Sequence, residues 1–302
     1  MRAIPDVLCL DLGGTGLKGA IVRSGEIIKR VFVRTDISCG RRGIEETFSK
    51  AFSVFSEKEY DAVALSSAGD IDSKKKAVTF ATDLLPGYTG FELGKFFSEK
   101  TGKPFECLND GQAALLGECF AREIREDMVA MLTLGTGVGG GVVCDGQLVE
   151  RGRLLSLGHL TLMEGGRLCT CGKRGCIEQY ASGSALTEAL FDRGIVCSRQ
   201  ELWRRYESGD ESVRAAVGEW LVYLRKACDL VYERYPFRLM ILGGGVSESG
   251  NSWFKNFKQS DRLGIFSNFP ILREKLFLLF PFRYRRFSDD RHKGIRCSRT
   301  CR

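Results

Sequence analysis

Residues 7–22, VLCLDLGGTGLKGAIV, give the clearest indication of the fold class. An apolar run from Val7 to Leu12 enters the glycine loop Gly13-Gly14-Thr15-Gly16, after which Leu17 to Val22 resumes an apolar run. Short apolar runs bounded by turn residues are typical of buried strands. The stretch therefore predicts a strand, a glycine loop and a second strand, which ends at the turn Ser24-Gly25.

A second copy of this pattern lies near residue 130. The apolar run Val129 to Leu134 enters Gly135-Thr136-Gly137, and the apolar run after it ends at the turn Asp145-Gly146. Laid over each other without a gap, residues 15–28 and 136–149 match in the Thr-Gly pair, the glycines and the hairpin turn. The sequence thus indicates two related halves, each with a glycine-rich hairpin that could hold a nucleotide from one side.

The rest of the chain alternates between helical and strand patterns. Apolar residues recur every three or four positions at Ile44, Phe48, Phe52 and Phe55, and again from Val213 to Val231. Short buried strands are predicted at Asp61–Ser67 and Leu239–Leu242. This alternation is typical of an α/β protein. We expect an N-terminal domain at residues 1–108, a larger domain at 109–267 and a separate tail at 268–302.

Composition restricts the classes of function. The chain has 302 residues, 43% hydrophobic and 27% charged, as in an ordinary globular protein. Its net charge of +7 equals the surplus of basic over acidic residues within 268–302, so we expect no nucleic-acid-binding face. The sequence contains neither a membrane-length apolar run nor a signal peptide, which predicts a cytoplasmic protein without a membrane partner.

One segment combines His159 with Cys169, Cys171 and Cys176, at spacings of ten, two and five residues. These four side chains are good zinc ligands. The chain has only two histidines, so one beside the densest cysteine cluster is not expected by chance. We predict a zinc ion with all four positions filled by protein, which makes the metal structural. Reduced thiols beside an unrelated histidine are the alternative.

The two glycine loops predict a phosphate site. In a glycine loop, backbone N–H groups are not shielded by side chains and can surround phosphate oxygens. Both loops follow a predicted strand and could bind phosphate in this way, and their residues are Gly13, Gly14, Thr15, Gly135, Thr136 and Gly137. Asp11 could hold Mg²⁺ directly or through water, while Lys18 faces the phosphates. Two tight hairpins with an incidental acid are the alternative.

A dinucleotide-dependent oxidoreductase also needs consideration, because residues 135–140 satisfy the G-x-G-x-x-G pattern. That fingerprint must open a helix, whereas Val142-Val143-Cys144 predicts a strand. The residues therefore argue against this class.

Asn109-Asp110 precedes a good helix former, residues 112–118, which places Asp110 at or near the helix N-cap. An aspartate at the mouth of an α/β cleft can also accept the proton of a substrate hydroxyl. The residues alone leave both roles open.

Together these segments resemble the ROK family of sugar kinases and regulators. The motifs that carry the resemblance occur in order between about residues 8 and 250, and they are LDLGGTGLK, LNDGQAALLGE, LTLGTGVGGGV, GH with CTCGKRGCIE, and LGGGVS. The resemblance implies an actin-like (ribonuclease H-like) ATPase fold of two domains around a cleft. It further implies ATP-Mg²⁺-dependent phosphorylation of a hexose or N-acetylhexosamine, and it is compatible with a homodimer.

The resemblance also implies roles by position. Asp110 corresponds to the catalytic base, and the residues expected at the sugar are Gly69, Asn109, Asp110, His159 and Glu178. Gly243, Gly244 and Gly245 would lie under the adenosine.

Three departures from the family pattern leave open an alternative, a catalytically weakened sugar-binding regulatory protein. Ser156 stands where the family usually has a glutamate that contacts the sugar, and Ala68 replaces the customary proline before Gly69. The aromatic and basic end, residues 277–302, replaces the closing helix of the family. A winged helix before the first phosphate motif is also missing, so we expect an enzyme rather than a DNA-binding repressor.

Overall fold

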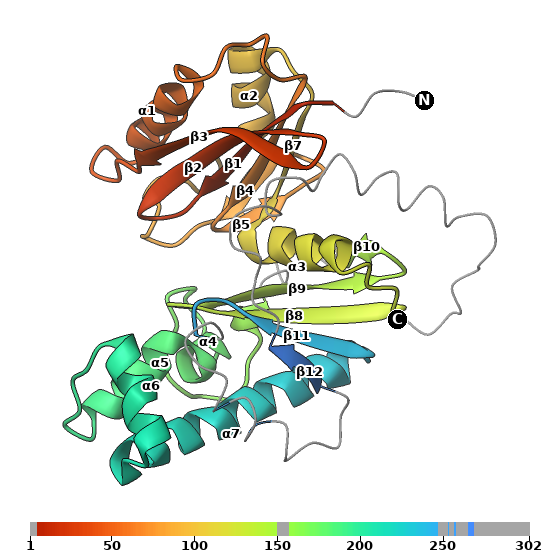
Figure 1. Cartoon of the computed structure of the whole chain (residues 1–302). Coiled ribbons are helices and arrows are strands. Elements are labelled where there is room, and N and C mark those ends of the chain that lie inside the picture. Colours follow the sequence, from red (N-terminus) through yellow and green to blue (C-terminus); the bar gives the residue numbers. More distant parts are fainter. Residues whose placement is uncertain (1–4, 150–156, 247–252, 254–256, 258–264, 269–302) are drawn as a thin grey trace.

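The computed structural model describes residues 5–149, 157–246, 253, 257 and 265–268. It contains two five-stranded sheets, one in each half of the chain, and helices pack against both of them (Figure 1). Ser156 and the tail beyond Asn268 lie outside the described residues. Among the described residues, no helix has the length and apolar character needed to cross a bilayer.

The first sheet contains the hairpin formed by residues 7–23. Its strand order is β3-β2-β1-β4-β7, with β1–β3 antiparallel to one another and β4 and β7 parallel to β1. The strands are β1 (Val7–Leu12), β2 (Gly16–Arg23), β3 (Glu26–Arg34), β4 (Ala62–Ser67) and β7 (Phe105–Asn109).

The second sheet repeats this plan. Its order is β10-β9-β8-β11-β12, again with an antiparallel hairpin followed by two parallel strands. The strands are β8 (Met128–Leu134), β9 (Val138–Cys144), β10 (Gln147–Leu148), β11 (Leu239–Gly243) and β12 (Ile265–Asn268). The duplication expected from the two glycine hairpins is therefore confirmed in the topology of the sheets.

The hairpin turns form as the sequence predicts. Ser24 and Gly25 have φ angles of 49° and 95°, and Asp145 and Gly146 have φ angles of 48° and 74°. Positive φ at both central residues defines the turn that matches strand twist, and glycine adopts it without a Cβ penalty.

Helices bury the apolar faces of both sheets. The first half has α1 (Arg41–Phe52) and α2 (Leu93–Thr101), together with the small hairpin β5 (Asp70–Asp72) and β6 (Ala77–Phe80). The second half has α4 (Glu178–Ala181), α5 (Gly183–Phe191), α6 (Arg199–Ser208) and α7 (Glu211–Arg234), after the short helix η2 (Leu157–His159). The two predicted helical patterns, at 44–55 and 213–231, correspond to α1 and α7.

Each half has its own apolar core. Phe48 and Phe97 are fully buried in the first half, where Phe97 also stacks on Phe105 with ring centroids 4.2 Å apart. Trp220 of α7 is buried in the second, with its indole N–H donating to Ser182 O at 3.0 Å. Burying such a side chain contributes roughly 1.5–3 kcal/mol, so these residues hold the helices on their sheets.

Helix α3 (Asp110–Ala121) lies between the two sheets (Figure 1) and begins directly after β7. It approaches β9 so closely that a Cβ on Gly111 would lie 2.3 Å from Gly140 N. Only glycines permit this contact between backbones. The first turn of α3, and with it Asp110, is thereby fixed against the second glycine hairpin.

Candidate functional site

Both glycine loops close through a backbone hydrogen bond. Gly13 N donates to Gly16 O at 3.0 Å, and Gly135 N donates to Gly137 O at 3.0 Å. The second loop is also held from α5, because Gly183 N donates to Gly135 O at 2.8 Å. Each loop thus sits at the end of the first strand of its hairpin, as the sequence predicts.

Asp11 lies at the end of β1, beside the first loop. Its carboxylate is 3.7 Å from Lys18 Nζ and accepts a hydrogen bond from Ser66 Oγ at 3.3 Å. Burial raises the pKa of Asp11, although Lys18 and Ser66 partly offset this effect. The Lys18 side chain is 71% exposed, so its ammonium can leave Asp11 for another anion.

Asn109, rather than Asp110, is the main capping residue of α3. Asn109 is the N-cap of α3, and its Oδ1 accepts hydrogen bonds from the N–H groups of Gly111 and Gln112 at 3.0 and 3.4 Å. Its Nδ2 donates to Gly69 O at 2.9 Å. Capping therefore falls mainly to Asn109, while the Asp110 carboxylate accepts a hydrogen bond from Gly111 N at 2.7 Å.

The environment of Asp110 favours its protonated form. Burial raises the pKa of Asp110 to about 6, and the charge of Asp11 adds to the shift, while the hydrogen bond from Gly111 N opposes it. A carboxyl group with a pKa near neutrality can take up and release a proton under physiological conditions. This property is what a general base requires.

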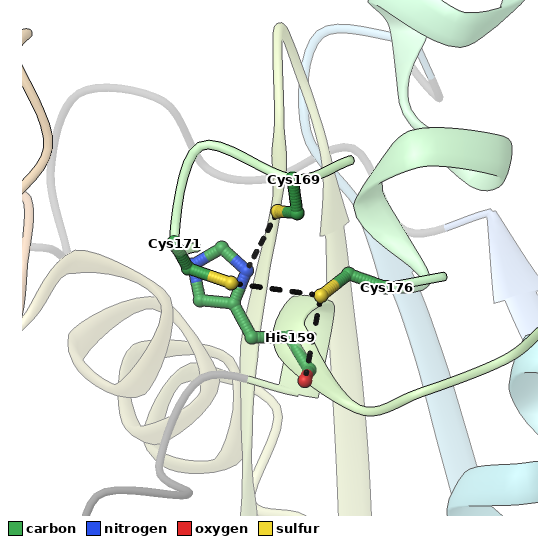
Figure 2. A group of neighbouring side chains, drawn as sticks. All are labelled: His159, Cys169, Cys171 and Cys176. Carbon is green, nitrogen blue, oxygen red and sulfur yellow. Dashed lines mark hydrogen bonds between the residues drawn. The ribbon is translucent and has the colours of Figure 1, made fainter. Parts of the chain in front are cut away.

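The predicted ligand cluster is brought together. His159, Cys169, Cys171 and Cys176 each offer a ligand atom, and these atoms lie within 4.8 Å of one another (Figure 2). Cys169 Sγ lies 3.6 Å from His159 Nδ1, and Cys171 Sγ lies 3.6 Å from Cys176 Sγ. Zn–S bonds of about 2.3 Å and Zn–N bonds of about 2.0 Å in a tetrahedron place ligand atoms roughly 3.5–3.8 Å apart. The cluster therefore fits a zinc ion.

The segment of residues 159–176, which we call the cysteine loop, folds tightly. Cys169 N donates to Lys173 O at 2.8 Å, and Gly172 N donates to Cys169 O at 2.9 Å. A Cβ on Gly175, whose φ is 75°, would lie 1.7 Å from Met163 O. No other residue could occupy this position without displacing the backbone.

Glu178 joins the cysteine loop to the second glycine hairpin. One carboxylate oxygen accepts a hydrogen bond from Val138 N at 3.1 Å, and the other lies 3.9 Å from Cys169 Sγ. A Cβ on Gly137 would lie 2.2 Å from Glu178 Oε2, so Gly137 makes room for this carboxylate. The sequence motif placed Glu178 at the site but carried no signal for this contact.

A cavity of about 360 Å³, lined by both polar and apolar side chains, opens beside the second glycine hairpin. Gly135 and Thr136 line it together with the beginning of α5, and its outer wall includes Phe191 and Val196, which are 67% and 83% exposed. Sequence reasoning missed these two residues, because exposed apolar side chains have no distinct pattern. Of the expected adenosine residues, Gly244 packs against Leu134, directly before this hairpin.

The chain is similar in sequence to known sugar kinases. The ROK family model matches residues 7–260. An N-acetylmannosamine kinase of Haemophilus influenzae is 32% identical over 213 residues, 70% of each chain. A glucokinase of Thermotoga maritima is 29% identical over 265 residues, covering 81% of this chain and 83% of the relative.

Solved structures agree with these matches. A ROK glucokinase of Streptomyces griseus in complex with glucose and AMPPNP has a TM-score of 0.71 at 27% identity, over 84% of this chain and 88% of that one. A ROK hexokinase of Thermus thermophilus has a TM-score of 0.69 at 28% identity, over 91% and 95% of the two chains.

The duplicated sheets, with a glycine hairpin at the end of each first strand, define an actin-like ATPase fold. Within this class, the chain belongs to the ROK family.

Proposed function

We propose that the protein transfers the γ-phosphoryl group of ATP to a hydroxyl of a hexose or N-acetylhexosamine, with Asp110 as general base. The broader class, an ATP-dependent sugar kinase, follows from relatives that are named glucokinase and N-acetylmannosamine kinase. The observation that carries the finer proposal is the position of Asp110 at the start of α3. There its carboxyl group lies against the second glycine hairpin, and its pKa is about 6.

The proposed reaction needs one proton transfer. The attacking sugar oxygen gives its proton to the Asp110 carboxylate as it forms a bond to the γ-phosphorus, and the bond from phosphorus to the ADP oxygen breaks. Gly111 packs closely on Gly140, so the first turn of α3, which carries Asp110, cannot move further toward the second glycine hairpin. Asn109 supports it by capping the helix and by binding Gly69 O, which fixes the neighbouring segment of the first half.

The proposed nucleotide site uses the two hairpins from opposite sides. Their backbone N–H groups would bind the phosphates, with Lys18 as a mobile cation, and the cavity beside Gly135 would hold the base. Asp11 is the residue we expect to hold Mg²⁺, since carboxylate oxygens are its preferred ligands. Mg²⁺ bound there would neutralise charge on the transferred phosphate.

We assign the ligand cluster to a structural zinc. Four protein ligands leave no open position for an activated water, so the metal would stabilise the loop rather than take part in the reaction. The sugar residues expected from the resemblance, His159 and Glu178, lie in or beside this loop. The metal would therefore act on sugar binding by holding these two side chains in place.

A substrate panel tests the proposed function. Purified protein is incubated with ATP-Mg²⁺ and, separately, glucose, mannose, fructose, allose, N-acetylglucosamine and N-acetylmannosamine, and ADP release is measured against a control without sugar. We expect sugar-dependent ADP release with at least one of them. Sugar binding measurable by calorimetry, without ADP release from any member, would instead favour the sugar-binding regulatory protein.

A further inference from the structure

Strand β5 presents two carboxylates on the face opposite its buried residue. Ile71 is 2% exposed and packs in the first core, so Asp70 and Asp72, on either side of it, point the other way. Both are part-buried. The two aspartates therefore share one face of the short hairpin β5–β6.

Of the two carboxylates, that of Asp72 is engaged by neighbouring residues. Its Oδ1 accepts hydrogen bonds from the N–H groups of Lys74 and Lys75 at 3.1 and 2.9 Å, and Oδ2 lies 3.9 Å from Lys75 Nζ. The Asp70 carboxylate has no hydrogen-bond or ion-pair partner among the described residues; only its backbone oxygen is engaged, by Thr79 Oγ1. A part-buried carboxylate without a partner is costly, which is a reason to look for a ligand.

The backbone places Asp70 at the candidate sugar site. Gly69, the residue before it, accepts the hydrogen bond from Asn109 Nδ2 at 2.9 Å, and Asn109 precedes Asp110. Two groups of the cysteine loop in the second half, His159 and Lys173, lie close enough to act electrostatically on the Asp70 carboxylate. Asp70 thus directly follows the backbone group that binds Asn109, a residue we assign to the sugar.

Lys173 does not satisfy this carboxylate. No ion pair within 4.0 Å joins the two, and the Lys173 side chain is exposed. Burial is the largest cause of the raised pKa of the Asp70 carboxyl group.

We propose that Asp70 is a specificity-determining sugar contact, whose carboxylate accepts a hydrogen bond from one hydroxyl, or a protonated amine, of the substrate. The inference rests on the proposed function, and adds to it a contact from the first half of the chain. It predicts that the preferred substrate carries a donor at the position that faces β5. A sugar without that donor leaves the carboxylate unpaired and binds more weakly.

The test measures sugar affinity by calorimetry without ATP, using the best substrate of the panel, for the full chain and for Asp70→Asn and Asp70→Ala. Loss of a charge-assisted hydrogen bond should weaken binding roughly ten- to a hundredfold. KM for the sugar should rise similarly, with KM for ATP unchanged. Glu57→Gln is the matched control, since this exposed acid precedes β4 at the opposite end of the sheet and should change neither constant.

Deoxy sugars then identify the donor. The set of monodeoxy derivatives of the substrate should contain one member that binds the full chain and Asp70→Asn equally, because it lacks the hydroxyl that Asp70 contacts. Every other derivative should keep the difference between the two proteins.

Two results would overturn the inference and leave the proposed function intact. One is unchanged sugar affinity in both Asp70 variants of an active kinase. The other is an equal loss of turnover in Asp70→Asn and Lys173→Gln with unchanged sugar affinity, which would assign Asp70 to a contact between the two halves. Absence of any sugar binding or phosphorylation by the unaltered chain would overturn both proposals.

Discussion

The carboxylate of Glu178 accepts a hydrogen bond from the backbone N–H of Val138 at 3.1 Å, which joins the cysteine loop to the second glycine hairpin. The other oxygen of the same carboxylate lies 3.9 Å from Cys169 Sγ. Through this side chain, the proposed metal ligands are connected to the proposed phosphate-binding loop. We therefore expect loss of the metal to affect phosphate binding.

We predict that the protein binds one zinc ion per chain and that Cys171→Ser loses it. Three ligands hold zinc far less tightly than four, and the loop would then release Glu178. Elemental analysis of gently purified protein measures the metal, and Cys39→Ser, an exposed cysteine outside the cluster, should leave the content unchanged. A Cys171→Ser protein with full zinc content would contradict the ligand assignment.

Gly137→Ala should separate folding from activity. The new Cβ would lie 2.2 Å from Glu178 Oε2, which is the end of a flexible side chain, so the chain can fold while Glu178 leaves Val138. We expect an unchanged zinc content and a Tm close to the original, with catalytic efficiency reduced at least roughly tenfold, as for loss of a charge-assisted hydrogen bond. Activity equal to that of the unaltered chain would show that the contact has no role in catalysis.

Two glycine substitutions test the packing of α3. A Cβ on Gly111 would meet backbone atoms of Gly140, so Gly111→Ala must shift the helix, which costs about 1–3 kcal/mol or more. A Cβ on Gly218, within α7, would have no neighbour within 4 Å, and Gly218→Ala should stabilise that helix by about 1 kcal/mol. Thermal unfolding should give opposite shifts in Tm for the two variants. Equal shifts would show that Gly111 is not held against Gly140.

The pKa of Asp110 predicts a pH-dependent effect on stability. Its folded-state pKa of about 6 exceeds the unfolded value of about 3.9, so the ionised form opposes folding at neutral pH. Asp110→Asn should therefore raise Tm at about pH 7. The gain should shrink as the pH falls through about 6 and vanish below about pH 4, where both states are protonated. A gain of equal size at both ends of this range would contradict the shift.

Much of the fold could be predicted from the sequence, because hairpins and periodic helices depend on neighbouring residues. Local sequence patterns are sufficient to predict the strand Val7–Leu12, the turn Ser24-Gly25 and helix α7. The ligand cluster was equally predictable, since its four residues lie in one short segment.

The remaining features depend on contacts between distant segments. Asn109 rather than Asp110 caps α3, and only the structure distinguishes neighbouring residues that both suit a cap. The bond from Glu178 to Val138 joins residues 40 positions apart. The sequence indicated no role for Asp70, because an unpaired carboxylate is visible only once its surroundings are known.

We propose that Asp110 removes the proton of the sugar hydroxyl. This proposal is tested by measuring transfer of labelled γ-phosphate from ATP to the best hexose by the unaltered chain and by Asp110→Asn, with hexose affinity determined in parallel by calorimetry. Removal of a general base should slow transfer roughly 10²–10⁴-fold while hexose affinity stays within a few fold. An Asp110→Asn protein that binds hexose normally and keeps more than about a tenth of the original rate would contradict the claim.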